Sequence, residues 1–352
     1  MIISDETGFR KKEVCEVDQG GLLMIRIREV ARLAGVSPAT VSRVINGTAN
    51  VKEDKRQRVL EVIRQTDFVP NEVARSLFKR SANIIGLIIP SIRNPYFTQM
   101  ASVIDEVAKE CGFRLFLCNV GNDLAQTRAA LQMLAAMNVS GVIISTTRPE
   151  LREDLESYPV PVILLDTMFQ ADQVRAYVYC DYYQGGRMAM EHLLECGCSN
   201  VVCIRGPEGV FSADTRYQGS MDVCRERGIR PQVLGCDYDF DAGLAMTEEL
   251  LRIYPDVDGI LACNDMVAIS IYKILYQKNI SVPGQIQLIG FDDITFSSLI
   301  TPELTTIRQP IQEMARRAAE LILEGTDPGK AGTHHVFPVS LIQRETTMKK
   351  SI

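Results

Sequence analysis

Residues 27–48 constrain this chain most, because their pattern predicts two short helices joined by a tight turn. The first helix has one apolar face, where apolar side chains recur at i, i+3, i+4 and i+7: Ile27, Val30, Ala31 and Ala34. Gly35 ends that helix and supplies a residue that tolerates a positive φ angle. Ser37 then suits the N-cap of a second helix, with Pro38 at the first helical position, where a missing N–H does no harm.

The second helix combines an apolar face with a polar one. The inward side chains are Val41, Val44 and Ile45. The outward side chains carry hydroxyl, guanidinium and amide groups, and they are Thr40, Ser42, Arg43 and Asn46. A short helix with this free face fits the major groove of DNA, where Arg43 has the reach for a guanine edge or for a phosphate. The alternative is a generic helical hairpin with a solvated polar face.

Charge is distributed unevenly along the 352 residues. The whole chain carries a net charge of −6. Residues 24–80 hold 12 Lys/Arg and 6 Asp/Glu, a net of +6, whereas residues 81–352 hold 23 basic and 33 acidic groups, a net of −10. A small basic module joined to a large acidic one fits a phosphate-binding headpiece on a sensor domain.

Length and composition exclude several classes of protein. No apolar run approaches the length of a membrane span, and the N-terminus lacks the apolar stretch of a signal peptide. The ten cysteines show no metal-ligand spacing and favour reduced, buried thiols over disulfides or a zinc site. No catalytic constellation and no glycine-rich phosphate loop occurs. We therefore expect a cytoplasmic protein that is not an enzyme and holds neither a metal nor a cofactor.

The first 82 residues of the chain divide into three parts. Residues 1–23 fit poorly with the pattern that begins at Met24, so we expect a disordered extension or a segment upstream of the true start. A third helix over residues 52–65 completes a DNA-binding domain over residues 24–70. Residues 71–82 are predicted to form an Asn-capped hinge helix and a linker.

From residue 83 the pattern changes to alternating strands and helices. The predicted strands are near-continuous apolar runs, typical of parallel strands covered on both faces: residues 84–89, 114–118, 141–144, 160–165, 201–204, 259–263 and 287–291. Amphipathic helices are predicted over residues 97–111, 124–137, 184–195, 217–227, 242–254, 265–277 and 311–323. The alternation predicts an α/β core of two doubly wound lobes over residues 83–348. We expect one lobe to comprise residues 83–178 and 309–325, and the other to comprise 179–308 and 326–348.

Polar residues follow several of the predicted strands directly. They are Ser91, Asn94, Asp166, Asn264 and Asp292. Arg216 lies in a predicted loop over residues 212–216. Because ligands bind beyond the carboxyl ends of strands in open α/β sheets, these side chains predict a ligand site. For Ser91, and for Asp265 and Asp293 nearby, a capping or loop-fixing role is a fair alternative.

Eight short motifs occur in a fixed order along the chain. They are VARLAGVS (30–37), TVSRVIN (40–46), PN with ARSL (70–77), IGLIIP (85–90), NPYF (94–97), ND (264–265), IGFDD (289–293) and LTTI (304–307). In this combination the chain resembles the lactose-repressor family of bacterial transcription regulators. The resemblance implies an all-α helix-turn-helix headpiece, a hinge helix and a two-lobed α/β core like that of periplasmic sugar-binding proteins. It also implies a homodimer that binds a pseudopalindromic operator in double-stranded DNA.

For DNA, the resemblance implies contacts from the second helix and from the hinge: Thr40, Ser42, Arg43, Asn46, Asn71, Ala74 and Leu77. Leu77 matches the leucine that wedges into the minor groove at the operator centre and kinks the duplex. A helix this short is unstable alone, so we expect it to order only on DNA, against its dimer mate. No heptad pattern follows residue 347, so we expect dimers and not tetramers.

For the ligand, the resemblance implies a cleft lined by polar residues and aromatic walls: Asn94, Asp166, Arg216, Asn264, Asp292 and Gln309, with Tyr96, Phe97 and Tyr238. Carboxylates, amides and a guanidinium can engage paired hydroxyls, and aromatic rings stack on the apolar face of a sugar. A carbohydrate effector is therefore predicted. Thr167 stands where ribose binders of the related class carry arginine, which argues against ribose itself.

These observations predict a transcriptional repressor whose operator affinity is set by a small ligand, a sugar, bound between two lobes. Within the family, the alternative is control by a purine or by a phosphoprotein. A sugar receptor without DNA function is disfavoured by the basic module at residues 24–80. A sugar-active enzyme is disfavoured by the lack of an acid/base pair in the sequence.

Overall fold

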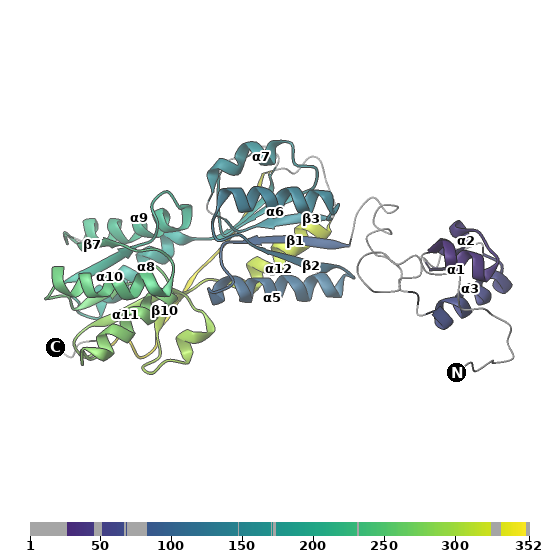
Figure 1. Ribbon diagram of the computed structural model, residues 1–352. Coiled ribbons are helices and arrows are strands. Elements are labelled where there is room, and N and C mark those ends of the chain that lie inside the picture. The colour runs from purple at the N-terminus through teal and green to yellow at the C-terminus, as the bar shows by residue number, and fades with distance from the viewer. Residues whose placement is uncertain are drawn as a thin grey trace, which may run out of the picture. The chain divides into compact units, whose positions relative to one another are not determined.

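The computed structural model describes residues 27–45, 51–66, 68, 83–146, 148–169, 171, 174–230, 232–324 and 332–349. The chain forms two compact units, residues 1–79 and 80–352 (Figure 1). The predictions for residues 1–23 and for the hinge at 71–82 lie outside the described residues, as do those for Asn46, Asn71, Ala74 and Leu77.

In the described part of the N-terminal unit, three helices surround a small apolar core. They are α1 (Ile27–Ala34), α2 (Pro38–Ile45) and α3 (Glu53–Thr66). Gly35, at φ +63°, turns the chain between α1 and α2, and the Val36 N–H donates to the Ala31 carbonyl at 3.0 Å to close the first helix. The core side chains come from all three helices and the residue after them: Val30, Ala31, Ala34, Val41, Val44, Val59 and Phe68.

The larger unit contains two six-stranded sheets, each at the centre of one lobe (Figure 1). The first sheet is fully parallel and has the order β11-β5-β4-β3-β1-β2. Its strands are β1 (Ile84–Ile89), β2 (Arg114–Asn119), β3 (Gly141–Ile144), β4 (Val162–Leu165), β5 (Val174–Cys180) and β11 (Thr333–Phe337). Along β1, Leu87 and Ile89 enter the core on one face and Ile88 the core on the other, so both faces are covered.

The second sheet has the order β12-β10-β9-β8-β6-β7 and is parallel except for β12, which runs antiparallel to β10. Its strands are β6 (Val201–Arg205), β7 (Gln232–Gly235), β8 (Gly259–Leu261), β9 (Gln287–Asp292), β10 (Thr305–Arg308) and β12 (Ser340–Ile342). The doubly wound α/β fold predicted from the sequence is confirmed.

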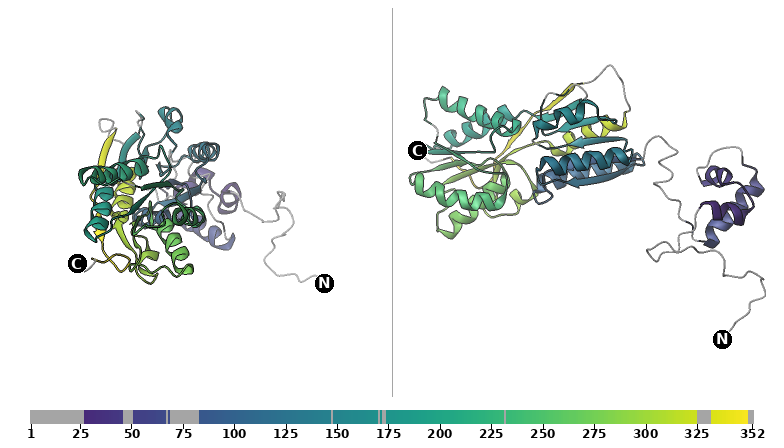
Figure 2. Two further views of the ribbon diagram at one scale, coloured as in Figure 1. Left: turned by 90° about the vertical axis from the view of Figure 1, so that its left-hand side faces the viewer. Right: turned by 45° about the horizontal axis from the view of Figure 1, so that its top comes forward.

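Helices cover both faces of each sheet (Figure 2). The first lobe carries α5 (Pro95–Glu110) with α12 (Ile311–Leu323) on one face, and α6 (Leu124–Ala136) with η1 (Pro149–Leu151) and α7 (Arg152–Glu156) on the other. The second lobe pairs α8 (Tyr182–Glu195) with α9 (Phe211–Glu226), and α10 (Phe240–Ile253) with α11 (Asp265–Gln277), and has the short helix η2 (Thr295–Ser298). The largest apolar cluster runs along the α5 and α12 side and continues into the α8 and α9 side of the second lobe.

The chain passes between the lobes three times. It crosses at Asp181 between β5 and α8, at residues 309–310 between β10 and α12, and at residues 338–339 between β11 and β12. The assignment of residues 326–348 to the second lobe is therefore wrong for β11. That strand pairs with β5 of the first sheet, with Thr333 opposite Ala176 and Phe337 opposite Cys180.

Two class predictions can be compared with the described part of the chain. None of its helices is long and apolar enough to cross a membrane. Its nine cysteines are free thiols, seven of them buried, as expected for small apolar side chains.

Candidate functional site

Helix α2 presents the side chains that the sequence assigns to DNA. Val41 and Val44 are buried against α1 and α3, which leaves Arg43 exposed and Thr40 and Ser42 half-exposed on the free side. The Ser37 hydroxyl caps the helix, because it accepts from the Thr40 N–H at 3.2 Å. The cap and the apolar face together fix which side of α2 faces outward.

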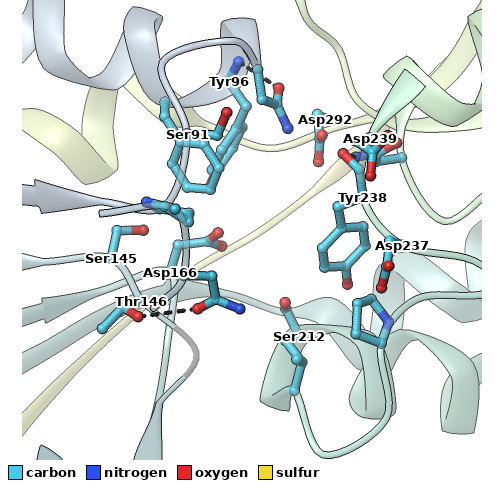
Figure 3. Close-up of a pocket in the computed structure, with 18 of the residues that line it drawn as sticks. Ser91, Tyr96, Ser145, Thr146, Asp166, Ser212, Asp237, Tyr238, Asp239 and Asp292 are labelled. Carbon is cyan, nitrogen blue, oxygen red and sulfur yellow. Dashed lines mark hydrogen bonds between the residues drawn. The ribbon is translucent and has the colours of Figure 1, made fainter. Parts of the chain in front are cut away.

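A cavity of about 470 Å³ lies between the two lobes of the larger unit. Its wall is built from residues that follow strands of both sheets: Ser91 after β1, Asn122 after β2, Ser145 and Thr146 after β3, Asp166 after β4, Pro207 after β6, Asp237, Tyr238 and Asp239 after β7, Asn264 after β8 and Asp292 at the end of β9. Figure 3 shows Ser145 and Asp166 approaching from the first lobe, and Asp237, Tyr238 and Asp239 from the second. This is the place where parallel α/β sheets bind ligands.

The structure brings together eight of the nine residues predicted for the ligand site. The lining residues among them are Asn94, Tyr96, Phe97, Asp166, Arg216, Tyr238, Asn264 and Asp292. Gln309 does not line the cavity. Sequence reasoning missed Asn122, Ser145, Thr146, Arg148, Ser212, Asp237 and Asp239 as lining residues. Asn122, Ser145 and Thr146 follow predicted strands, so their position alone could have identified them. Asp237 and Asp239 follow β7, which was not predicted.

Arg216 and Asp292 form the most buried charged pair of the cavity. Their side chains are 10% and 6% exposed, and the closest guanidinium nitrogen lies 3.8 Å from the carboxylate. The same nitrogen, Nη1, donates to the Cys263 carbonyl at 2.9 Å. The guanidinium carbon, Cζ, also lies over the Phe291 ring, 3.8 Å from its centroid. Burial raises the pKa of Asp292 well above its ordinary value, and the positive charge of Arg216 opposes that shift.

A close contact between α8 and α9 positions Arg216. A Cβ on Gly186 would lie 2.0 Å from the Arg216 carbonyl oxygen, so only glycine allows this approach. Ser220 donates to both the Gly186 and Arg216 carbonyls at 3.0 Å. The prediction that residues 212–216 form a loop is wrong, because α9 begins at Phe211 and Arg216 lies in its second turn.

Asp166 is the corresponding carboxylate of the first lobe. Its side chain accepts a hydrogen bond from the Tyr182 hydroxyl. Burial raises the pKa of Asp166, and Arg216 opposes the shift. Asp166 and Asp292 both adopt positive φ angles, 59° and 121°, which are rare for residues other than glycine. Such backbone strain at two facing carboxylates is typical of a functional site.

Gln309 connects two cavity residues from behind. Its side-chain amide donates to Asp292 at 2.7 Å, and its oxygen accepts from the Tyr96 hydroxyl at 3.2 Å. Gln309 is 2% exposed and stands at one of the three crossings between lobes. It therefore holds groups of both lobes in register without facing the cavity.

Two polar atoms at the cavity wall lack a hydrogen-bond partner among the described residues. They are Nε of Arg216 and the Tyr238 hydroxyl, and both are buried. Both atoms have almost no accessible surface in this structure, and burying such groups unpaired is costly. Asp265, in contrast, has a structural role: its carboxylate accepts from Thr306, Ser297 and the Ile294 N–H. Within the described residues, no cluster of His, Cys, Asp or Glu could hold a metal ion.

Comparison with known proteins decides the family. Residues 26–71 match the bacterial regulatory proteins of the lacI family. Residues 82–345 match the periplasmic binding proteins and sugar-binding domain of the LacI family. The chain belongs to the LacI family. The family and the two-part fold predicted from the sequence are confirmed, and the chain is accordingly a DNA-binding transcription regulator.

Individual relatives cover nearly the whole of this LacI-family chain. The ribose operon repressor of Halalkalibacterium halodurans is 35% identical over 92% of this chain and 97% of its own. The lac repressor dimer bound to operator and the anti-inducer ONPF is similar with a TM-score of 0.81 and 26% identity, covering 92% of this chain and 99% of that one. A periplasmic binding protein/LacI transcriptional regulator from Alkaliphilus metalliredigens QYMF, complexed with D-xylulofuranose, has a TM-score of 0.67 and 33% identity over 76% of this chain and 99% of its own.

Proposed function

We propose that this LacI-family protein is a cytoplasmic, non-enzymatic repressor whose operator affinity is controlled by a five-carbon sugar bound in the cavity between the lobes. The observation that carries the proposal is the convergence of strand ends from both sheets on one cavity rich in hydrogen-bonding side chains. Two relatives support the size class, since one is named for a ribose operon and the other was solved with D-xylulofuranose.

The chemistry of the wall suits a polyol. Asp166, Asn264 and Asp292 can each accept or exchange hydrogen bonds with neighbouring hydroxyls. Tyr96, Phe97 and Tyr238 supply aromatic surface for the apolar face of the ring. Thr167 is 5% exposed and does not line the cavity, so this position supplies no arginine to the wall, and the argument against ribose itself remains a prediction.

A ligand in this cavity acts on the relative orientation of the lobes. Besides the three crossings, the lobes are joined by side-chain contacts: Gln99 donates to Thr295 at 2.6 Å, and Arg93 lies 3.4 Å from Asp241. These two contacts are exposed, whereas the hydrogen bond of Tyr182 to Asp166 and those of Gln309 link the lobes in the interior. A sugar that engages both walls changes the balance between lobe arrangements. The ligand shifts that balance only by its differential affinity for the two arrangements.

We also propose the DNA-binding roles of the residues predicted from the sequence. Thr40, Ser42 and Arg43 lie on the free side of α2, and we propose that they read the operator as predicted. Asn46, Asn71, Ala74 and Leu77 remain predictions from the family resemblance. A homodimer matches a pseudopalindromic operator by symmetry.

The test is calorimetry on the full chain with D-ribose, D-xylulose, hypoxanthine and guanine. It is followed by fluorescence anisotropy on an operator selected by the protein from random duplexes. We expect a pentose to bind and to change operator affinity at least about fivefold. Binding of a purine with no sugar binding would overturn the sugar assignment and favour the purine-controlled alternative. Loss of all sequence preference on DNA would overturn the repressor assignment.

A further inference from the structure

The charges around the cavity are unbalanced. Four carboxylates line it, from Asp166, Asp237, Asp239 and Asp292, against two guanidinium groups, from Arg148 and Arg216. The formal charge of the wall is therefore −2, and neither lysine nor histidine is among the described lining residues. With one of the two buried carboxylates protonated, the wall still carries a negative charge.

Neither guanidinium is available as a dedicated anion receptor. Arg216 is engaged by Asp292, by the Cys263 carbonyl and by the Phe291 ring. Arg148 donates from Nε to the Asn122 carbonyl at 2.7 Å. Sites for phosphate use a bidentate arginine or several cations. The wall that the second lobe supplies has three carboxylates for its single arginine.

The helix N-termini around the cavity are also already satisfied. Asn94, Asp239 and Asn264 cap α5, α10 and α11, and each accepts from a backbone N–H of the first turn at 2.9 to 3.0 Å. The N-terminus of α9 has no side-chain cap, but Asp214 in its first turn accepts from the Gly209 N–H at 3.1 Å and pairs with Arg205 at 2.7 Å. Side-chain oxygens thus occupy the positions where an anion would gain from the helix dipoles; they belong to carboxylates at α9 and α10 and to neutral amides at α5 and α11.

We propose that the cavity is a charge filter that admits uncharged sugars and rejects their phosphate esters. In this proposal Asp237 and Asp239 are its specificity-determining residues. Both are exposed and flank Tyr238 on the wall of the second lobe (Figure 3), so a phosphate entering the cavity meets two carboxylates for which the described residues supply no ion-pair partner. Specificity of this kind comes from repulsion of the wrong ligand as much as from contacts to the right one. The inference rests on the proposed function, because it presumes that a sugar is the ligand. The repressor would accordingly respond to a sugar before phosphorylation and ignore the product of a sugar kinase.

The test compares two matched pairs of ligands by calorimetry on the full chain: D-ribose with D-ribose 5-phosphate, and D-xylulose with D-xylulose 1-phosphate. Both esters leave free the hydroxyl that closes a furanose ring. We expect the phosphate ester of the bound sugar to bind at least about 30-fold more weakly at low salt. The ratio should fall when salt is raised, because Asp237 and Asp239 are solvent-exposed and therefore screened.

The Asp237→Asn/Asp239→Asn variant tests the assignment to these two residues. Asparagine keeps the size of both side chains and caps α10 as well as aspartate does. The ratio of the two dissociation constants should fall at least about fivefold in this variant. The matched control is Glu195→Gln/Asp256→Asn, which removes two exposed charges from outside the cavity and should leave the ratio unchanged. If the double variant folds poorly, Asp237→Asn alone, at an exposed position outside any helix or strand, gives the same comparison.

The outcomes separate the two proposals. A phosphate ester that binds as tightly as its parent sugar, or a ratio that the double variant leaves unchanged, overturns the charge filter and leaves the sugar-controlled repressor standing. If neither form of either sugar binds, the proposed function fails, and the filter fails with it.

Discussion

The Arg216 guanidinium lies between the Phe291 ring and the Asp292 carboxylate, so one side chain joins an apolar platform to a buried charge at the cavity wall. Burial raises the pKa of Asp292, and the positive charge of the guanidinium opposes that shift. The pair thus combines a structural role with a role in ligand binding.

Replacing Asp292 by asparagine should uncouple the ligand from DNA. The change keeps the shape of the side chain but leaves Arg216 without its opposite charge and removes a charged acceptor, worth about 1.5 to 3 kcal/mol. We expect effector affinity to fall on the order of 10- to 100-fold, while operator binding without effector stays near wild type. Calorimetry and anisotropy on the same preparation measure both. A wild-type effector response in the variant would remove Asp292 from the ligand site.

Gln309→Met tests the support behind the wall. The substitution keeps the length of the side chain and loses the hydrogen bonds to Tyr96 and Asp292, so both become less well oriented. We expect the free energy of effector binding to become less favourable by about 1 to 2 kcal/mol, although Gln309 does not line the cavity. Gln126→Met, at an exposed position on α6, is the matched control. Equal affinities of the two variants would show that Gln309 has no positioning role.

Arg43→Ala tests the outward face of α2. Loss of a guanidinium that reads a base should weaken operator binding by about 1 to 3 kcal/mol and relax the preference at one position. Titrations against single-base operator variants measure this. Arg252→Ala removes an equal charge from an exposed position on α10 and should have no effect. Uniform weakening on every sequence would instead assign Arg43 to a phosphate.

The buried carboxyl of Asp265 should make the free energy of unfolding decrease as pH rises. Burial raises the pKa of this carboxyl from 3.8 to about 7 in the folded chain, so folding favours the protonated form. The stabilisation that this carboxyl provides is therefore complete below about pH 4 and is lost as pH rises to about 7. In between, the free energy of unfolding falls by up to about 1.4 kcal/mol per pH unit. Urea unfolding between about pH 4.5 and 8 covers most of this titration. Over this range the free energy of unfolding should decline less steeply with pH for Asp265→Asn than for the wild type.

Asp256→Asn is the control for that series, because Asp256 is exposed. The same pH slope in Asp265→Asn and in the wild type would show that other buried carboxyls, such as Asp166 and Asp292, dominate the dependence.

The sequence predicted those strands best that are most uniformly apolar. Strands β1, β3 and β9 lie inside the sheets, are buried on both faces and stand out as apolar runs. Strands β7, β11 and β12 lie at sheet edges and carry polar or half-exposed side chains, so a search for apolar runs passes over them. The inner strands β5 and β10 were missed as well, because polar residues such as Arg175 and Thr306 interrupt them, whereas the half-exposed edge strand β2 was predicted. The lobe assignment of β11 failed for the same reason, since an unpredicted strand has no predicted partner.

The start of α9 was missed because its usual signal is absent. The N-cap position holds Val210, which offers no side-chain acceptor, and the first turn depends on Asp214 and Gly209 instead. Gln309 was placed in the cavity for a different reason. It lies one residue beyond the end of β10, and whether such a side chain faces the ligand or stands behind its neighbours depends on tertiary packing.

The chain crosses between the lobes three times, and this also determines how the core responds to proteolysis and to truncation. Neither lobe is a continuous stretch of sequence, so neither can be produced alone by simple truncation of the gene. A protease that cuts one crossing leaves two covalent links, and the nicked core should keep migrating as one particle until it is denatured. Three covalent crossings keep the lobes together, so any change in their relative orientation has to be accommodated at residues 181, 309–310 and 338–339.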